Sequence, residues 1–283
     1  WTKESEIGKN LFAHGGVWEC PDLLQFNVNG KTSWVLLVSM NPGGPNGGSA
    51  TQYIVGDFDG HAFKPYSTDI KWMDYGPDNY AGVTFSNVGD RNILIGWMSN
   101  WNYANIVPTE KWRSAMTVPR ELKLIEQNYK NANSKNFLLV SSPVKEFMNA
   151  FKEIISKENV IPNRIDIKAI KAMDFEIILS NTSNEKLIIG YHADKKQFFI
   201  DRTKAGVSNF NDGFAAVAVA PRLSFATNMD LSILLDKTSV ELFADGGRTV
   251  MTALFFPTSP YTKWEIKSKE KRTPDSIKLY SFK

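Results

Sequence analysis

The sequence predicts an all-β protein built in two parts. Short runs rich in β-branched and aromatic residues recur along the chain, and clusters of Gly, Pro, Asn and Asp separate them. A single stretch with helical spacing interrupts these runs near the middle. Strands of this length and spacing are typical of β-propellers and β-sandwiches.

The first part contains five strand-like runs and one strong break. The break is Asn41–Ser49, whose Pro and Gly content is incompatible with a helix or a central strand. The strands are expected at Thr32–Met40, Thr51–Phe58, Tyr80–Ser86, Asn92–Met98 and Asn136–Ser141.

The stretch Ser142–Glu158 predicts an amphipathic helix. Ser142 suits the N-cap and Pro143 the first helical position. Apolar residues then recur at intervals of three and four, at Val144, Phe147, Met148, Phe151, Ile154 and Ile155.

Strands resume after this helix and predict a second all-β unit, a sandwich. Asp245-Gly246-Gly247 is expected to form a hairpin turn between the last two of them. The predicted organisation is therefore a first domain over 1–141, a helical linker over 142–158 and a sandwich over 159–283. The second-part strands are expected at Phe175–Leu179, Lys186–His192, Gln197–Asp201, Leu231–Leu235, Val240–Ala244 and Val250–Phe256.

Composition excludes several classes of function. The chain is 42% hydrophobic and 22% charged, as expected for a globular protein with a sizeable core. Its net charge is +3 and its basic residues are dispersed, which argues against a nucleic-acid partner. The longest apolar runs are far too short to cross a membrane. One cysteine, Cys20, excludes an internal disulfide, and the start at Trp1 suggests a cut point within a longer product.

The segment Trp18-Glu19-Cys20-Pro21 places a carboxyl group in unusual surroundings. A large aromatic residue and a small thiol flank Glu19, and Pro21 restricts the backbone just after it. Such neighbours would partly desolvate the carboxyl group, as a general acid working near neutral pH requires. The alternative is an exposed glutamate at a strand end.

Tryptophans and asparagines offer a sugar-binding interpretation. Aromatic faces stack on the apolar C–H faces of sugar rings, although core packing is the commoner role of a strand tryptophan. Asparagine amides can bind hydroxyl groups, although they commonly stabilise turns. The candidates are Trp97, Trp101, Trp112, Asn41, Asn46, Asn100 and Asn102.

Other chemistries find less support. The histidines are scattered, which disfavours a metal cluster or a Ser/His/Asp arrangement, and Gly43–Gly48 lacks the Lys-Ser/Thr of a phosphate loop. Paired carboxylates remain the favoured chemistry. The partner of Glu19 is left open among Asp22, Asp57, Asp59, Asp74 and Asp78.

Glu19-Cys20-Pro21-Asp22 resembles the Glu-Cys-Pro motif of glycoside hydrolase family 32, the invertases, inulinases and levanases. The resemblance is firm over most of Lys9–Leu122, and the later segment Leu231–Pro257 resembles the C-terminal sandwich of the family. Further blocks follow in family order at Asn41–Gly48, Gln52–Gly60, Asp74–Ala81, Gly96–Trp101, Pro108-Thr109, Trp112–Ser114 and Pro119–Leu122.

This resemblance implies a five-bladed β-propeller, a linker and a β-sandwich, and a retaining fructosidase mechanism without a cofactor or metal. It implies that Glu19 is the general acid/base, acting on sucrose, inulin or levan. Trp97 resembles the aromatic wall of the fructose subsite and Asn41 a polar liner, and Asp74 and Tyr80 are further substrate-binding candidates. The extracellular substrates of the family imply secretion.

The sequence departs from the family in one respect. The nucleophile motif Trp-Met-Asn-Asp-Pro-Asn-Gly and the Arg-Asp-Pro motif are absent from it. We therefore expect a C-terminal portion that supplies the acid/base but not the nucleophile. The missing propeller segment would come from the same gene product or from a second chain. The alternatives are a rearranged protein without catalysis and a non-catalytic fructan- or sucrose-binding protein on the same scaffold.

Overall fold

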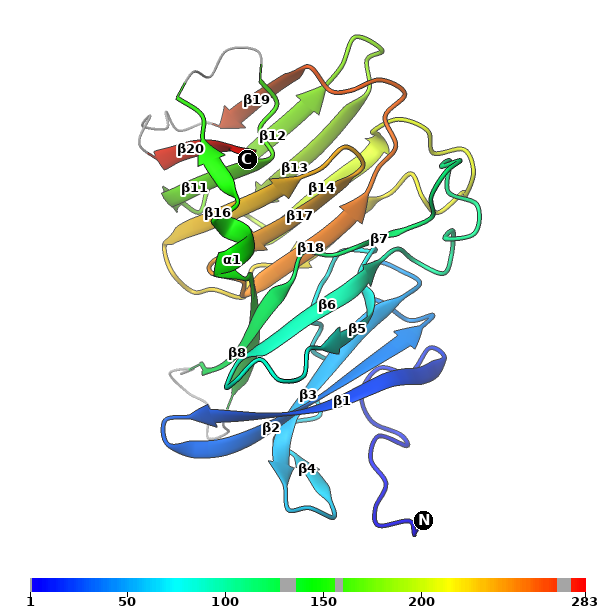
Figure 1. The fold of residues 1–283 in the computed structure, drawn as a ribbon, viewed down its shortest axis with the longest axis vertical. Coiled ribbons are helices and arrows are strands. Elements are labelled where there is room, and N and C mark those ends of the chain that lie inside the picture. Colours follow the sequence, from blue (N-terminus) through cyan, green and yellow to red (C-terminus); the bar gives the residue numbers. More distant parts are fainter. Residues whose placement is uncertain (1, 128–135, 156–159, 269–275) are drawn as a thin grey trace.

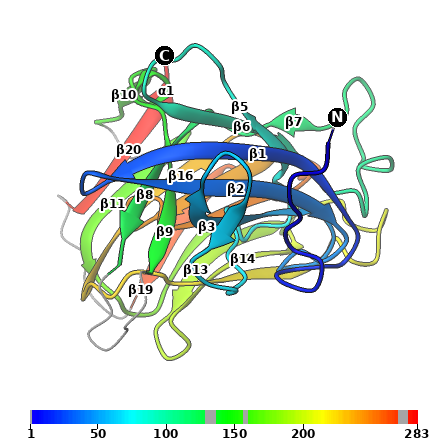
Figure 2. The same cartoon turned by 90° about the horizontal axis from the view of Figure 1, so that it is seen from below.

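The computed structural model describes residues 2–127, 136–155, 160–268 and 276–283. They form an all-β structure of four antiparallel sheets, two in each part of the chain. Figure 1 shows the two parts stacked along the long axis, with the N-terminus at the far end of the first, and Figure 2 views the molecule from that end. Within the described ranges, no helix has the length and apolar character needed to cross a membrane.

The first sheet, in the order β1-β2-β3-β4, carries the Glu19 segment. Its strands are β1 (Val17–Val28), β2 (Lys31–Asn41), β3 (Ala50–Phe58) and β4 (Phe63–Pro65). The strands expected at Thr32–Met40 and Thr51–Phe58 correspond to β2 and β3, but β1 was not expected.

The second sheet has the order β5-β6-β8-β9, with β7 paired to β6. Apolar side chains from the two sheets, among them Leu37, Leu94 and Leu139, meet in one core between them. The strands are β5 (Tyr80–Thr84), β6 (Asn92–Met98), β7 (Ala115–Met116), β8 (Arg120–Glu126) and β9 (Phe137–Pro143).

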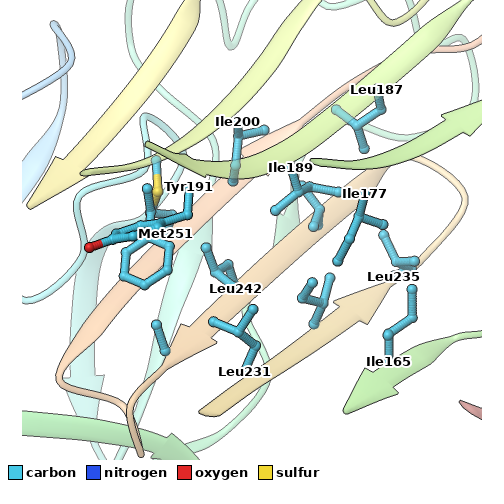
Figure 3. Packing of buried hydrophobic residues seen from close by; sticks show 14 of the residues in the cluster. Ile165, Ile177, Leu187, Ile189, Tyr191, Ile200, Leu231, Leu235, Leu242 and Met251 are labelled. Atoms are coloured by element: carbon cyan, nitrogen blue, oxygen red, sulfur yellow. The ribbon is translucent and has the colours of Figure 1, made fainter. Parts of the chain in front are cut away.

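The second part of the chain is a sandwich of two sheets packed face to face. Figure 3 shows side chains from both sheets, including Ile177, Ile189, Leu231 and Leu242, meeting in one apolar core. Each of these four side chains is almost completely removed from water, so this core is a main source of hydrophobic stabilisation.

One sandwich sheet has the order β10-β20-β11-β16-β17-β18 and the other β15-β14-β13-β12-β19. The predicted turn at Asp245-Gly246-Gly247 is confirmed, with positive φ at all three residues. The strands are β10 (Phe151–Glu153), β11 (Arg164–Lys171), β12 (Phe175–Ser180), β13 (Lys186–His192), β14 (Gln197–Lys204), β15 (Val217–Pro221), β16 (Asn228–Leu235), β17 (Ser239–Ala244), β18 (Thr249–Leu254), β19 (Lys263–Ser268) and β20 (Ile277–Phe282).

The helix predicted over Ser142–Glu158 is wrong for most of its length. Ser142 and Pro143 end β9, and among the described residues 142–155 the one helical turn is α1 (Lys145–Met148), with Val144 as its N-cap. Phe151 begins a strand that pairs with β20, opposite Phe282. Residues 156–159 lie outside the described residues.

Tertiary packing explains this correction. Phe147, Met148 and Phe151 all pack against the outer apolar cluster that contains Leu234 and Phe243. One helical turn followed by a strand brings them there, so the helical spacing is satisfied without a long helix. Ile155, which an amphipathic helix would bury, is 96% exposed.

Candidate active site

A β-bulge follows Glu19 directly. On β1, Glu19 lies opposite Ser39 of β2 and Asp22 lies opposite Leu37, so Cys20 and Pro21 together face one residue. Cys20 has a φ of 47°, and Pro21 has no N–H to lose from the ladder. The Cys-Pro pair therefore forms the bulge, and Glu19 is the last regularly paired residue before it.

Tyr80, the first residue of β5, contacts the Glu19 carboxylate. Its hydroxyl donates a hydrogen bond to Oε2 of Glu19, while its ring is 2% exposed. Burial, followed by the hydrogen bond and the negative charge of Glu19, raises the pKa of Tyr80 well above its usual value. Tyr80 therefore remains a neutral hydrogen-bond donor at ordinary pH.

Two tryptophans continue this group of side chains. Trp97 of β6 is the cross-strand partner of Tyr80, and the two rings meet edge to face with centroids 6.3 Å apart. The ring centroids of Trp101 and Trp97 are 5.0 Å apart, and half of the surface of Trp101 is exposed. We call Glu19, Tyr80, Trp97 and Trp101 the Glu19 group. It joins a carboxylate to aromatic surface open to solvent, a combination suited to a sugar ring.

Asn41 is connected to this group through Ser49. The Ser49 hydroxyl donates to Oδ1 of Asn41 at 2.9 Å and accepts a bond from the backbone N–H of Trp101 at 3.0 Å. Asn100 also binds this loop, because its Oδ1 accepts a bond from the N–H of Ser49 at 3.3 Å. Trp101 and Ser49 thus contact residues of the candidate site. The sequence offers Trp101 only as one of several possible sugar-binding residues and does not point to Ser49.

The environment of Glu19 differs from the expected one. Trp18 stacks on His14 at 4.9 Å and donates its indole N–H to the carbonyl of Ala13, so it anchors the preceding segment. Glu19 and Cys20 are both exposed in this chain. The expected desolvation by Trp18 and Cys20 is therefore not observed, and the specific partner of Glu19 is Tyr80.

Asp74 is a buried member of the contact between the two parts of the chain. Its carboxylate accepts bonds from Arg120 at 2.8 Å and from the Thr252 hydroxyl at 2.6 Å. Further bonds come from the backbone N–H groups of Gly76 and Thr252 and from the Asn79 side chain. The predicted role of Asp74 as a substrate ligand conflicts with this position, since only 3% of the residue is exposed.

The five aspartates considered as partners of Glu19 all accept hydrogen bonds from other groups. Asp22 accepts a bond from Thr84 at 2.6 Å, and Asp78 forms a buried ion pair with Arg202. Asp57 accepts a bond from the Tyr66 hydroxyl, and Asp59 accepts bonds from the backbone N–H groups of residues 61 and 62. The bonds of Asp74 are those given above. None of them is thereby marked as a nucleophile opposite Glu19.

Two other features lie away from the Glu19 group. The donor atoms of Asp174, His192 and Asp194 lie within 4.8 Å of one another on the sandwich and are the described residues that could hold a metal ion. A cavity of about 440 Å³ is lined by Phe147, Phe282 and residues of both parts of the chain. Neither includes a member of the Glu19 group, so we identify the site by its contacts and not by cavity size.

Comparisons with known proteins show to which family the chain belongs. The N-terminal domain of glycosyl hydrolases family 32 matches residues 1–138, and the C-terminal domain of the same family matches residues 125–281. An extracellular exo-inulinase of Aspergillus ficuum is 37% identical, over 92% of this chain and 53% of the relative. A levanase of Bacillus subtilis is 36% identical, over 91% of this chain and 41% of the relative.

Solved structures show the same relationship. The crystal structure of an exo-inulinase from Aspergillus awamori matches 99% of this chain and 59% of its own, with a TM-score of 0.84 and 31% identity. A β-fructofuranosidase from Schwanniomyces occidentalis, complexed with fructosyl-erythritol, matches 93% of this chain and 56% of its own, with a TM-score of 0.74 and 28% identity. The chain spans about half the length of the relatives that it matches. The chain belongs to glycosyl hydrolase family 32.

Proposed function

We propose that this chain is part of a secreted, retaining β-fructofuranosidase that hydrolyses terminal β-fructosyl bonds in sucrose, inulin or levan. Its family membership and the names of its relatives support a fructosidase. One observation carries the proposal for this chain: the Glu19 carboxylate, exposed beside a bulge of β1, accepts a hydrogen bond from Tyr80, whose ring contacts Trp97 and through it the exposed Trp101.

Glu19 acts as the general acid and then as the general base. Its proton passes to the glycosidic oxygen as the bond from that oxygen to the fructosyl C2 breaks, and the fructosyl group passes to a carboxylate nucleophile. The Glu19 carboxylate then takes a proton from the water molecule that releases fructose. Tyr80 donates its hydrogen bond to the ionised form of Glu19, and it therefore stabilises the charge that appears as the proton leaves.

The nucleophile comes from a segment outside this chain, in the same gene product or in a second chain. The sheets β1–β4 and β5–β9 then serve as two blades of a five-bladed propeller, and 142–158 connects them to the sandwich at 159–283. Supporting this, β1 and β5 are sheet edges that carry the exposed residues Val17 and Val83, which additional blades would cover.

Trp97 and Trp101 form the wall of the fructosyl subsite, and Asn41 holds the neighbouring loop. The exposed face of Trp101 supports this assignment, since an aromatic face and the C–H face of a furanose are both apolar. Tyr80 is assigned to Glu19 and not to the sugar.

The test is chemical rescue of Glu19→Ala in a protein that combines this chain with the nucleophile segment. Hydrolysis of sucrose should fall by about 10²–10⁴-fold, the usual contribution of general acid–base catalysis. With β-fructosyl fluoride, whose leaving group needs little protonation, azide should restore turnover and give fructosyl azide, because azide needs no general base to attack the fructosyl-enzyme.

Glu110→Ala is the matched control, because Glu110 is an exposed glutamate outside the Glu19 group. It should keep normal turnover. Sucrose hydrolysis that survives Glu19→Ala would remove the acid/base assignment. Hydrolysis by the unaccompanied 283-residue chain would show that no outside nucleophile is needed.

A further inference from the structure

The segment Asp74–Asn79, which we call the anchor segment, lies directly on strand β18 of the sandwich. The backbone N–H of Tyr75 donates to the carbonyl of Val250 at 2.8 Å, and that of Asp78 donates to the carbonyl of Thr252 at 3.2 Å. A side chain at Gly76 would lie 2.1 Å from backbone atoms of Thr252. The anchor segment therefore extends the edge of the sandwich sheet, although it belongs to the first part of the chain.

Side chains of the anchor segment return these bonds. The backbone N–H of Thr252 donates to Asp74 at 2.9 Å, and that of Leu254 donates to Asp78 at 2.8 Å. The Thr252 hydroxyl donates to Asp74 and also accepts a bond from Arg120 at 2.7 Å. The backbone N–H groups of Thr252 and Leu254 in β18 are thus bonded to Asp74 and Asp78, respectively.

Two buried arginines fix the same two aspartates. Arg120 binds Asp74 and Glu241, and Arg202 binds Asp78. All these charged groups are almost fully removed from water, where a misplaced partner costs several kcal/mol. The anchor segment is therefore held in one position relative to β18.

The anchor segment ends immediately before Tyr80. Asp78, bonded to Leu254, is two residues from Tyr80, and Asn79 donates its amide to Asp74 at 3.2 Å. This short connection ties the backbone position of Tyr80 to that of β18. Misplacement of a catalytic group by about 1 Å can lower a rate about 10²-fold.

We propose that the sandwich positions the general acid/base: β18 holds the anchor segment, which places the Tyr80 hydroxyl against Glu19. Thr252, which touches neither Glu19 nor Tyr80 in the contacts described, is a positioning residue for proton transfer. This proposal rests on the role assigned to Glu19 above, and it gives the sandwich a part in catalysis beyond stability.

The test compares two leaving groups in the complete protein. Sucrose needs a proton from Glu19 when its C2–O bond breaks, whereas fluoride leaves β-fructosyl fluoride with far less need of one. In Thr252→Val, kcat/KM for sucrose should fall about tenfold while kcat/KM for the fluoride stays within about twofold of wild type. A purely structural loss would lower both values together, and that result would overturn the proposal, as would an unchanged value for sucrose.

Thr249→Val is the matched control. Thr249 is a buried threonine on the same strand, but its hydroxyl bonds to the Pro221 carbonyl and the Leu223 N–H within the sandwich. This variant should leave the ratio of the two kcat/KM values unchanged. Glu19→Ala in the same assay separates the two proposals, because an equal loss on both substrates in that variant would reject the acid/base role itself.

A second measurement also uses the complete protein. The carbon NMR signal of the Tyr80 ring carbon that bears the hydroxyl reports the hydrogen bond to Glu19, and Glu19→Ala, which removes the acceptor, calibrates its loss. The signal in Thr252→Val should move in the same direction as in Glu19→Ala, and in Thr249→Val it should stay in place. A stationary signal in folded Thr252→Val would contradict the positioning role.

Discussion

The Tyr80 hydroxyl donates a hydrogen bond to the Glu19 carboxylate, which lies sixty-one residues away in the sequence. Tyr80 begins one sheet, and Glu19 lies beside the bulge of another. The donor is buried and the acceptor is exposed, so the pair presents a carboxylate to solvent from a fixed support. A hydrogen bond to a charged group is worth about 1.5–3 kcal/mol.

Tyr80→Phe removes only this hydroxyl. We expect kcat/KM of the complete enzyme on sucrose to fall by roughly tenfold to a hundredfold, because ionised Glu19 loses its donor as the proton leaves. Steady-state kinetics checks this. Tyr66→Phe, which removes a tyrosine hydroxyl that is bonded to Asp57 and lies outside the Glu19 group and the anchor segment, is the control and should have wild-type kinetics. An unaltered Tyr80→Phe enzyme would mean that the bond does not serve catalysis.

Trp97→Ala should weaken both binding and turnover. Trp97 lies between Tyr80 and Trp101, so its loss removes stacking surface and the support of a neighbouring ring. We expect kcat/KM for sucrose to fall at least about tenfold, or about 1.4 kcal/mol. Trp112→Ala is the control, because Trp112 is an exposed tryptophan that is not part of the Glu19 group. Equal losses of kcat/KM in the two variants would mean that Trp97 serves only ordinary packing.

The strands were largely predictable because apolar and β-branched runs mark them directly. Lys186–His192 was predicted with the observed bounds of β13. Strand β1 was not predicted, because Pro21 is a strand breaker and its tolerance here depends on the bulge opposite β2. The helix over Ser142–Glu158 was wrong because pairing of Phe151 with Phe282 is a contact that a local pattern does not contain.

The candidate site was also only partly predictable from the sequence. A motif resemblance identified Glu19, Tyr80 and Trp97, which the structure brings into one contact group. The position of Asp74 depends on Arg120 and Thr252, which are 46 and 178 residues away along the chain. The residues next to Asp74 in the sequence do not reveal these distant partners. A local motif therefore cannot distinguish a buried interface aspartate from an aspartate that binds sugar.

Arg120→Met should destabilise the fold strongly. Arg120 binds both Asp74 and Glu241, so its loss leaves two buried carboxylates without their cation. Breaking a buried ion pair in this way costs about 3–5 kcal/mol. Urea unfolding of the 283-residue chain measures the change. Arg91→Met is the control, since its pairs with Glu146 and Glu121 lie at the surface and should shift the urea midpoint little. Similar midpoint shifts for both variants would argue against a tight interface.

Glu185 should contribute to the free energy of unfolding at neutral pH, and this contribution should be lost in acid. Burial acts to raise its pKa, but hydrogen bonds from Thr258 and Asn181 outweigh it and hold the pKa below the ordinary value of 4.5. A depressed folded pKa gives stability that is complete above pH 4.5 and disappears as the pH falls through the folded value. Wild type should therefore exceed Glu185→Gln in free energy of unfolding at pH 7, and the gap should narrow below pH 4.5. Urea titrations at both ends of this range measure the gap, with Glu110→Gln controlling for the loss of one negative charge. A gap that is the same at every pH would show that the Thr258 and Asn181 bonds do not favour the ionised form.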